Sequence, residues 1–303
     1  MHAVLLCLAG LLASALSLPA WSLDFSKAEI AKILEHGPWP PPIKISGKPD
    51  AIALGEKLFF EPRLSGTGSV LCATCHVPFR QFQDGRARAF GLQEVDRNTP
   101  TLVNSRFYRR YGWDGARDSL WAQSIRPLLD EREMRATPAH VATVVRRLYA
   151  AEYETVFGRA VPQDNQEALT DVGKALAAFQ ETLVSGRTPF DDFRDALERG
   201  DTKTGYSAAA QRGLKIFVGK GDCSACHSGA QFSNGEVIEK FRVPGLRGVA
   251  QTAPYLHDGR FATLDALLKF HSMHLSEEER ADLASFLESL SAPGMVRTDQ
   301  GAP

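Results

Sequence analysis

Cysteine is scarce in this chain, and its placement limits how the fold can be cross-linked. Five cysteines occur among 303 residues, and Cys7 lies in an apolar N-terminal run that is typical of a removed leader. The other four form two pairs, Cys72 with Cys75 and Cys223 with Cys226, and a histidine directly follows each pair. In a Cys-x-x-Cys-His pattern the two thiols normally bind another chemical group and do not form a disulfide with each other. We therefore expect no structural disulfide.

An excess of either charge is also missing. The 35 Lys and Arg residues nearly balance the 36 Asp and Glu residues, which leaves a formal net charge of −1. Proteins that bind nucleic acid or anionic membrane surfaces carry a marked basic excess. The balance of charge therefore predicts no nucleic-acid partner.

Beyond its first residues, the sequence has no apolar run long enough to cross a bilayer, which takes about 20 residues. Residues 1–22 contain a shorter apolar run and are interpreted as a secretory signal peptide. His2 is the only side chain there that can be positive, which is atypical of such a leader. The mature chain is expected to be soluble, to have no membrane span, and to be periplasmic in a Gram-negative bacterium.

The two Cys-x-x-Cys-His sequences, residues 72–76 and 223–227, are the most informative feature that is present. In c-type attachment sequences the two thiols bond covalently to haem, and the adjacent histidine ligates the iron. A zinc site would need both cysteine pairs to converge on one ion, which would leave His76 and His227 unexplained. The sequence therefore predicts two covalently bound c-type haems, with His76 on the first iron and His227 on the second.

Apolar residues recur at helical spacing along much of the chain. The predicted helices cover residues 51–60, 120–129, 141–157, 168–183, 208–217, 264–270 and 281–290, and residues 84–101 are predicted to form a loop. Ser276 and Glu279 form a capping-box pattern before the last helix. No segment has a clear strand pattern. The expected fold class is mainly α, with two cytochrome c-like domains that each hold one haem, at residues 23–190 and 200–293, and a tail at 294–303.

Four segments outside the haem sequences resemble the bacterial dihaem cytochrome c peroxidase / MauG superfamily. They are residues 53–60 (Ala-Leu-Gly-Glu-Lys-Leu-Phe-Phe), 97–101 (Arg-Asn-Thr-Pro-Thr), 113–115 (Trp-Asp-Gly) and 252–259 (Thr-Ala-Pro-Tyr-Leu-His-Asp-Gly). Together with the haem sequences they are spread from residue 53 to residue 259, over most of the mature chain. The resemblance implies that peroxide reacts at the N-terminal haem and that the C-terminal haem passes electrons. It also implies that the two domains face each other around a bound calcium ion.

The resemblance also assigns roles near the first haem. Trp113 matches the family's tryptophan between the haems, where an indole can divide one long electron jump into two shorter ones; the alternative is a buried core tryptophan. Gln123 and Glu133 match the distal glutamine and glutamate, and Pro127 is expected to line the same pocket. A carboxylate there can move a proton between the two oxygens of peroxide, so Glu133 is the expected general acid/base. The alternative is a surface charge, with Glu131 only two residues away.

Three residues match the calcium ligands of the family. They are Asn98, Thr252 and Pro254. The resemblance implies an all-oxygen site in which Thr252 and Pro254 act through backbone carbonyls, the kind of ligand that Ca²⁺ prefers.

Two features depart from the ordinary peroxidases of this superfamily. Those enzymes have methionine nineteen residues after the calcium threonine, as the second ligand of the C-terminal haem, and MauG has tyrosine there. Here that position is His271, with Met273 and His274 close enough to be alternatives. The peroxidases also carry a histidine after the first haem sequence that caps the iron, whereas residues 77–100 contain none. The first haem is therefore expected to be five-coordinate and to need no reductive activation.

The leading functional hypothesis is an enzyme of MauG type, in the MauG/MbnH-like branch. Hydrogen peroxide oxidises the first haem, the two haems share a high-valent state across Trp113, and a residue of a periplasmic partner protein, a tryptophan, is oxidised by long-range electron transfer. The first alternative is a cytochrome c peroxidase that reduces H₂O₂ to water with electrons from a small donor cytochrome. The second is a non-catalytic dihaem electron carrier, which would leave Gln123 and Glu133 without a role.

Overall fold

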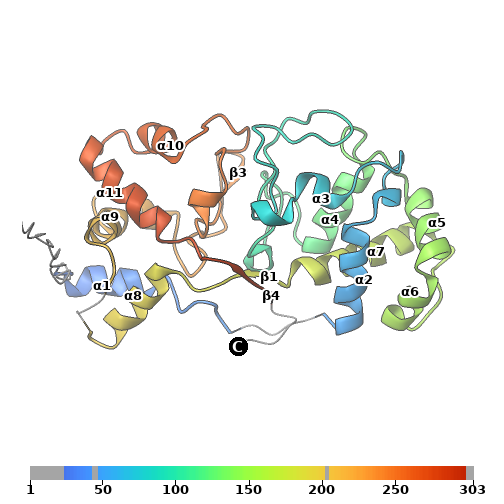
Figure 1. Ribbon diagram of the computed structural model, residues 1–303, viewed down its shortest axis with the longest axis horizontal. Coiled ribbons are helices and arrows are strands. Elements are labelled where there is room, and N and C mark those ends of the chain that lie inside the picture. Colours follow the sequence, from blue (N-terminus) through green and yellow to red (C-terminus); the bar gives the residue numbers. More distant parts are fainter. Residues whose placement is uncertain (1–23, 43–46, 202–204, 298–303) are drawn as a thin grey trace, which may run out of the picture.

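The computed structural model describes residues 24–42, 47–201 and 205–297. The predicted signal peptide at residues 1–22 and the end of the predicted tail lie outside the described residues. The described part is mainly helical, as the sequence predicted, and its helices gather in two lobes (Figure 1). No helix in this part combines the length and apolar character that a membrane span needs.

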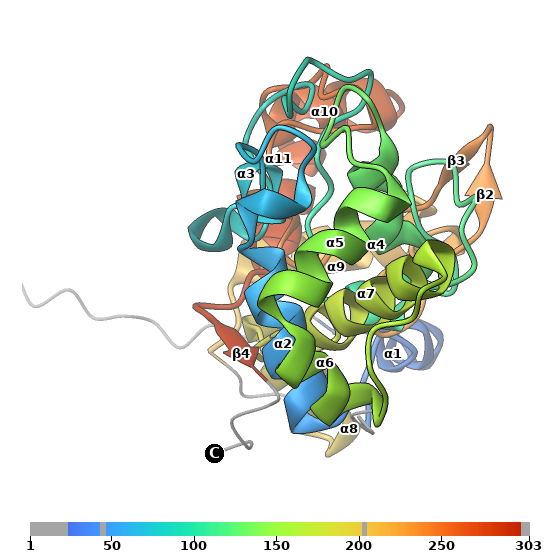
Figure 2. The same ribbon diagram turned by 90° about the vertical axis from the view of Figure 1, so that its right-hand side faces the viewer.

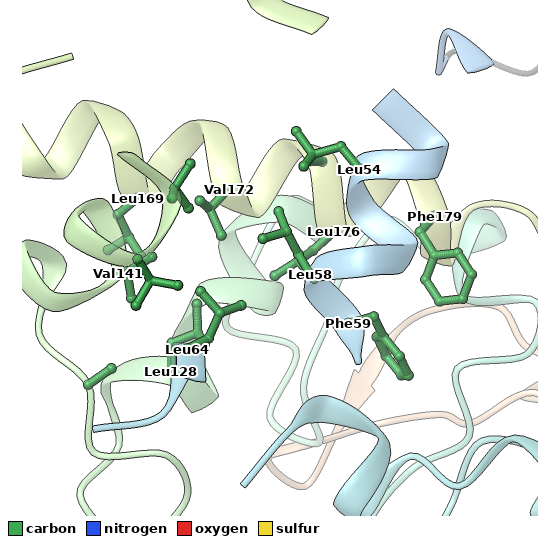
Figure 3. Close-up of a cluster of buried hydrophobic side chains, with 14 of the residues drawn as sticks. Leu54, Leu58, Phe59, Leu64, Leu128, Val141, Leu169, Val172, Leu176 and Phe179 are labelled. Carbon is green, nitrogen blue, oxygen red and sulfur yellow. The ribbon is translucent and has the colours of Figure 1, made fainter. Parts of the chain in front are cut away.

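One lobe, on the right in Figure 1, holds the first haem sequence. Its helices are α2 (Pro49–Phe59), α3 (Cys72–Cys75), α4 (Leu120–Leu129), α5 (Pro138–Leu148), α6 (Ala150–Phe157) and α7 (Asn165–Gln180). The long helix α7 packs against α2, α4 and α5, and their apolar side chains meet in one core. Figure 3 shows part of this core, with Leu54, Leu58, Phe59, Leu64, Leu128, Val141, Leu169, Val172, Leu176 and Phe179 labelled.

The other lobe holds the second haem sequence. Its helices are α1 (Lys27–Leu34), α8 (Pro189–Glu198), α9 (Ala208–Val218), α10 (Leu264–His271) and α11 (Glu277–Glu288). Ile33 of α1 and Phe190 of α8 are fully buried in the same core as Phe217 of α9 and Phe286 of α11. The helix nearest the N-terminus therefore packs in the second core, although the predicted division of the chain placed it with the first.

Two short antiparallel strand pairs complete the fold. Strand β1 (Leu183–Ser185) pairs with β4 (Met295–Arg297), so the C-terminal segment returns to the end of α7 (Figure 1). The turned view shows β4 on the left, near α2 (Figure 2). Strand β2 (Val237–Ile238) pairs with β3 (Phe241–Arg242). Strands of two or three residues are too short to show an alternating pattern, which explains why the sequence predicted none. Short 3₁₀ turns lie at Pro62–Leu64, Pro78–Arg80, Ser105–Phe107, Cys223–Ala225 and Val249–Gln251.

Helical periodicity located most helices well. Helix α4 has the predicted bounds, and α2, α9 and α10 begin and end within two residues of theirs. The predicted helix 141–157 is divided into α5 and α6, because the backbone leaves the helical region at Tyr149. The capping box is confirmed, since Ser276 and Glu279 each accept a hydrogen bond from the other's amide. Helix α1 was not predicted; eight residues form a marginal helix on their own and depend on packing.

Glycine allows a close contact between two helices in each lobe. In α2, a Cβ at Gly55 would lie 1.9 Å from the backbone oxygen of Ala175 in α7. In α9, a Cβ at Gly213 would lie 2.0 Å from the backbone oxygen of Asp282 in α11. In each lobe, the helix that precedes the haem sequence therefore packs closely against the backbone of a later helix: α2 against α7, and α9 against α11.

Gly213→Ala is expected to lower the free energy of unfolding by about 2–3 kcal/mol, because the added methyl group forces α9 and α11 apart. Thermal or chemical denaturation of the haem-loaded protein measures this change. Gly205→Ala is the matched control, since nothing lies within 4 Å of a Cβ at that position. Equal losses of stability in the two variants would contradict the close-contact explanation.

Candidate functional site

A cavity of about 330 Å³ lies in the first lobe. Cys72, Cys75 and His76 of the first haem sequence line one part of it. The same cavity is lined by the other residues predicted for this site, namely Asn98, Trp113, Gln123, Pro127 and Glu133. The fold thus brings together the haem sequence at residues 72–76, Asn98, and residues from the segment 113–133.

A phenylalanine carbonyl orients the histidine of each haem sequence. Nδ1 of His76 lies 2.9 Å from the carbonyl oxygen of Phe82, and Nδ1 of His227 lies 3.1 Å from that of Phe232. Phe82 and Phe232 both have left-handed backbones, with φ of 53° and 55°, which few residues other than glycine adopt. When Nδ1 donates its proton to a carbonyl, Nε2 keeps the free lone pair that iron ligation needs.

The ionisation of these groups also suits haem. Burial lowers the pKa of His76, and it lowers the pKa of His227 to about 4, so both imidazoles are in the neutral, ligating form. Burial raises the pKa of the Cys72 and Cys75 thiols to about 12 and that of Cys223 to about 11. None of the four described cysteines is in a disulfide. Unpaired thiols beside a neutral imidazole, in the first lobe around a cavity, fit a covalently attached haem.

The predicted distal residues come from α4 and the loop after it. Gln123 and Pro127 are one turn apart on α4, and Pro127 has no N–H to donate to the carbonyl of Gln123. The chain then turns back sharply, because the carbonyl of Asp130 accepts hydrogen bonds from the amides of Glu133 (3.1 Å) and Arg135 (2.9 Å). This turn places Glu133 beside the helix that carries Gln123.

The carboxylate of Glu133 is mostly buried and is paired with an arginine that the sequence did not single out. Nη1 of Arg126 lies 2.8 Å from Oε1 of Glu133, whose side chain is 20% exposed. Burial raises the pKa of Glu133, and the charge of Arg126 opposes that rise. Glu131, the alternative, is exposed and is not among the described residues that line the cavity. Arg126 stands three residues after Gln123 in the sequence, and that helical spacing was the signal that could have found it.

Trp113 lies where the two lobes meet. Its indole Nε1 donates a hydrogen bond of 2.8 Å to the carbonyl of Asn98. Its own carbonyl accepts one of 2.8 Å from the amide of Arg242 in β3, and its ring meets that of His257 edge to face, with centroids 6.5 Å apart. The imidazole of His257 is in turn stacked on the ring of Phe241, with centroids 3.8 Å apart. The side chain of Trp113 is partly buried. It lines the cavity of the first lobe and also contacts residues of the second lobe.

His271 is the last residue of α10. It lies close enough to His227 for its charge to lower the pKa of His227, although burial is the larger cause. All three candidate ligands are exposed: Met273 has 79% of its surface exposed, and His271 and His274 are exposed as well. Of the three residues considered from the sequence, His271 is thus the one with an interaction with His227 among the described groups. Its role as a haem ligand stays a prediction.

Sequence reasoning missed the group of side chains packed behind His227. The imidazole of His36 stacks on the ring of Phe232 at 4.5 Å, and burial lowers its pKa to about 4. Arg247 lies over Trp39 at 3.9 Å and forms a bidentate ion pair with Asp191, at 2.8 and 3.0 Å. These groups hold the segment whose carbonyl orients His227. The segment with His36 and Trp39 is rich in proline and has no periodicity, so its only signal was its isolated aromatic and histidine residues.

The three residues predicted for calcium lie on two segments that are hydrogen-bonded to each other. The amide of Asn98 donates to the carbonyl of His257 at 2.8 Å, and its side-chain Nδ2 donates to the carbonyl of Arg86 at 2.7 Å. The described residues contain no cluster of three or more His, Cys, Asp or Glu side chains that could hold a metal. The predicted site uses an amide side chain and the carbonyls of Thr252 and Pro254 instead. Calcium binding stays a prediction.

Comparison with known proteins gives the family. Residues 49–199 match the family model described as di-haem cytochrome c peroxidase. The chain is 36% identical to methylamine utilization protein MauG of Methylorubrum extorquens, over 80% of this chain and 79% of that protein. It is 32% identical to cytochrome-c peroxidase IdrP1 of Denitromonas iodatirespirans, over 86% and 87% of the two chains. It is also 32% identical to cytochrome c551 peroxidase of Pseudomonas aeruginosa, over 78% of each chain.

Solved structures give the same fold. A MauG-like protein associated with microbial copper homeostasis has a TM-score of 0.70 at 24% identity, over 90% of this chain and 96% of that one. The diheme peroxidase BthA from Burkholderia thailandensis also has a TM-score of 0.70, at 20% identity, over 85% and 91% of the two chains. From its sequence identity to several relatives along most of its length, the chain belongs to the dihaem cytochrome c peroxidase and MauG family of oxidoreductases, as its motifs predicted.

Proposed function

We propose that the protein is a MauG-type enzyme, which uses hydrogen peroxide and two c-type haems to oxidise a residue of a partner protein. One observation carries this proposal. His76 is the only histidine among the described residues that line the first cavity, and residues 77–100 contain none. The side of the cavity that holds Gln123 and Glu133 is therefore free of a competing imidazole. Such a site can accept peroxide without first being reduced.

The residues of the two Cys-x-x-Cys-His sequences are suited to hold two c-type haems. Cys72, Cys75 and His76 would attach and ligate the first haem. The second would be held by Cys223, Cys226, His227 and His271. When bound, the haems would supply the redox chemistry needed to reduce peroxide and to hold its two oxidising equivalents.

The distal side chains supply the proton transfer. The carboxylate of Glu133 takes a proton from the inner oxygen of peroxide and returns it to the outer oxygen, which leaves as water. Gln123 lines the same cavity and offers both a donor and an acceptor to the peroxide. Pro127 lies on the same helix and exposes a ring without an N–H to this space.

Trp113 is suited to carry electrons between the lobes. It lines the first cavity and contacts His257 of the second lobe, so it lies on the route from one haem sequence towards the other. Its hydrogen bond to the carbonyl of Asn98 fixes the indole plane. A pair of imidazoles, His227 and His271, favours the oxidised state of iron more than an imidazole with a thioether does. Such a ligand pair suits a haem that stores oxidising equivalents.

The partner completes the proposal. Because oxidation proceeds by electron transfer through Trp113, the oxidised residue can remain on the surface of a periplasmic partner protein; a tryptophan is the expected one. The relative with the highest identity given above is named MauG. A calcium ion bound by Asn98, Thr252 and Pro254 would tie together the two segments that carry these contacts.

A second function has specific support. Two relatives of 32% identity are named peroxidases, and a peroxidase would use Glu133 and Gln123 in the same way. In that case the electrons come from a small cytochrome, and the product is water alone. The two functions differ in whether the resting protein reacts with peroxide.

The test is to mix the fully oxidised, diferric protein with hydrogen peroxide in the absence of any reductant and to follow its visible and near-infrared spectrum. A MauG-type enzyme is expected to change its spectrum at stoichiometric peroxide and to keep the change until a reductant or partner is added. Protein that has first received one electron serves as the comparison. If only this half-reduced form reacts, the peroxidase function replaces the proposed one.

A further inference from the structure

We propose that Arg126 is a positioning residue that fixes the carboxylate of Glu133 in the cavity and keeps it in its proton-accepting form. This inference rests on the peroxide chemistry proposed for the site. The guanidinium group bridges two carboxylates: its Nη1 lies 2.8 Å from Oε1 of Glu133, and its Nη2 lies 3.7 Å from Oδ2 of Asp130. A hydrogen bond between two charged groups is stronger and more directional than one between neutral groups.

The backbone around Glu133 explains why its side chain needs such an anchor. Glu133 lies in a loop, where its amide donates to Asp130 and its carbonyl accepts from the amide of Leu92 at 3.0 Å. These bonds fix the backbone but leave the torsions of a long side chain free to rotate, which costs free energy to restrict. Arg126 instead projects from helix α4, at a spacing of three from Gln123, so the two side chains lie on one face of that helix. Pairing with Arg126 therefore ties the carboxylate of Glu133 to the helix that carries the distal amide of Gln123.

The charges around Glu133 also indicate that Arg126 keeps its carboxyl group ionised. The groups that act on it are Arg126 from α4, Asp130 and Arg132 from its own loop, and Cys75 from α3. Burial and Asp130 raise its pKa, whereas Arg126 gives the largest opposing effect and Arg132 a smaller one. Cys75 carries no charge once it is bonded to haem. Loss of Arg126 is thus the change that most favours the protonated, inactive carboxyl group.

Cyanide is a suitable probe, because hydrogen cyanide must give its proton to a distal base when it binds ferric haem. We expect the binding rate constant, measured by stopped flow against pH, to decrease on the acid side as Glu133 becomes protonated. In Arg126→Gln this acid limb should move to higher pH. At a fixed pH on the limb, the rate constant should fall about tenfold, since one opposite charge at this distance is worth about one pKa unit or more.

Matched variants separate position from charge. Arg126→Lys keeps the charge and is expected to restore the position of the acid limb. Arg132→Gln removes an equal charge one residue from Glu133 and should shift the limb less. In a Glu133→Gln background, Arg126→Gln should cause no further change, because two residues that act through one group are not additive. The spectrum of the second haem shows in each variant that the fold is intact.

Either of two results would overturn the inference. One is an acid limb that stays in place in Arg126→Gln, and the other is an equal loss of rate when Glu133 has already been replaced. The cyanide result is independent of what the enzyme does with peroxide. If the limb moves but the diferric protein ignores peroxide, the positioning role stands and the proposed function fails.

Discussion

Glu133→Gln is expected to slow the reaction of the diferric protein with hydrogen peroxide by about 10²- to 10⁴-fold, the range typical of a lost general acid–base group. Glutamine keeps the size of the side chain and can still accept a hydrogen bond from Arg126, but it cannot take up a proton. Stopped-flow absorbance at several peroxide concentrations gives the second-order rate constant.

Glu131→Gln is the matched control for that experiment. Glu131 is a glutamate of the same loop, but it is exposed and lies outside the group of described residues that line the cavity, so its replacement is expected to leave the rate unchanged. A Glu133→Gln rate within tenfold of the original would remove Glu133 from the proton transfer. A loss in Glu131→Gln instead would transfer the role to that residue.

The same carboxylate predicts the sign of the pH dependence. In the proposed mechanism Glu133 acts without its proton, so the rate should fall as the pH falls through the pKa of Glu133. Because burial raises that pKa, the fall should begin at a higher pH than an exposed glutamate would give. The second-order rate constant for the reaction of the diferric protein with hydrogen peroxide, measured at a series of pH values, checks this prediction.

The sequence predicted best the features that depend on near neighbours. A haem attachment sequence is a local unit, because the two thiols and the ligating histidine must reach one porphyrin from one turn of chain. Helix α4 was located to the residue because its apolar positions repeat at helical spacing over ten residues. For Glu133 the sequence supplied only a position in a family motif, and the structure shows that it lines the cavity with Gln123.

Features that depend on distant contacts could not be predicted in this way. Helix α1 is stabilised by packing against the second core, which no pattern within its eight residues reveals. The buried ion pair of Arg247 with Asp191 joins residues far apart in the chain, and each looks like an ordinary surface charge in the sequence. Likewise, nothing in the sequence marks Phe82 as a residue with a left-handed backbone. Its carbonyl oxygen lies 2.9 Å from Nδ1 of His76, a contact between residues that no sequence pattern links.

His271→Ala is expected to change the spin state of the second haem. In the oxidised protein, electron paramagnetic resonance should show one high-spin centre and one low-spin centre of bis-histidine type, because in the proposed arrangement His76 alone would ligate the first iron and both His227 and His271 would ligate the second. Removal of the His271 imidazole leaves the second iron without its sixth ligand, so the low-spin signal should disappear and a second high-spin signal should replace it. The first centre is the internal reference, since it lies in the other lobe.

Three further variants decide which residue is the ligand. His271→Met should keep the second haem low-spin but raise its reduction potential, because a thioether favours Fe(II) relative to an imidazole. Met273→Ala and His274→Ala alter the exposed residues that follow α10 and are expected to leave both the signal and the potential unchanged. If the low-spin signal survives in His271→Ala but is lost in one of these two variants, that residue is the ligand. The pairing of His227 with His271 would then be only a contact between neighbouring side chains, and the argument that the second haem is tuned to store oxidising equivalents would lose its chemical basis.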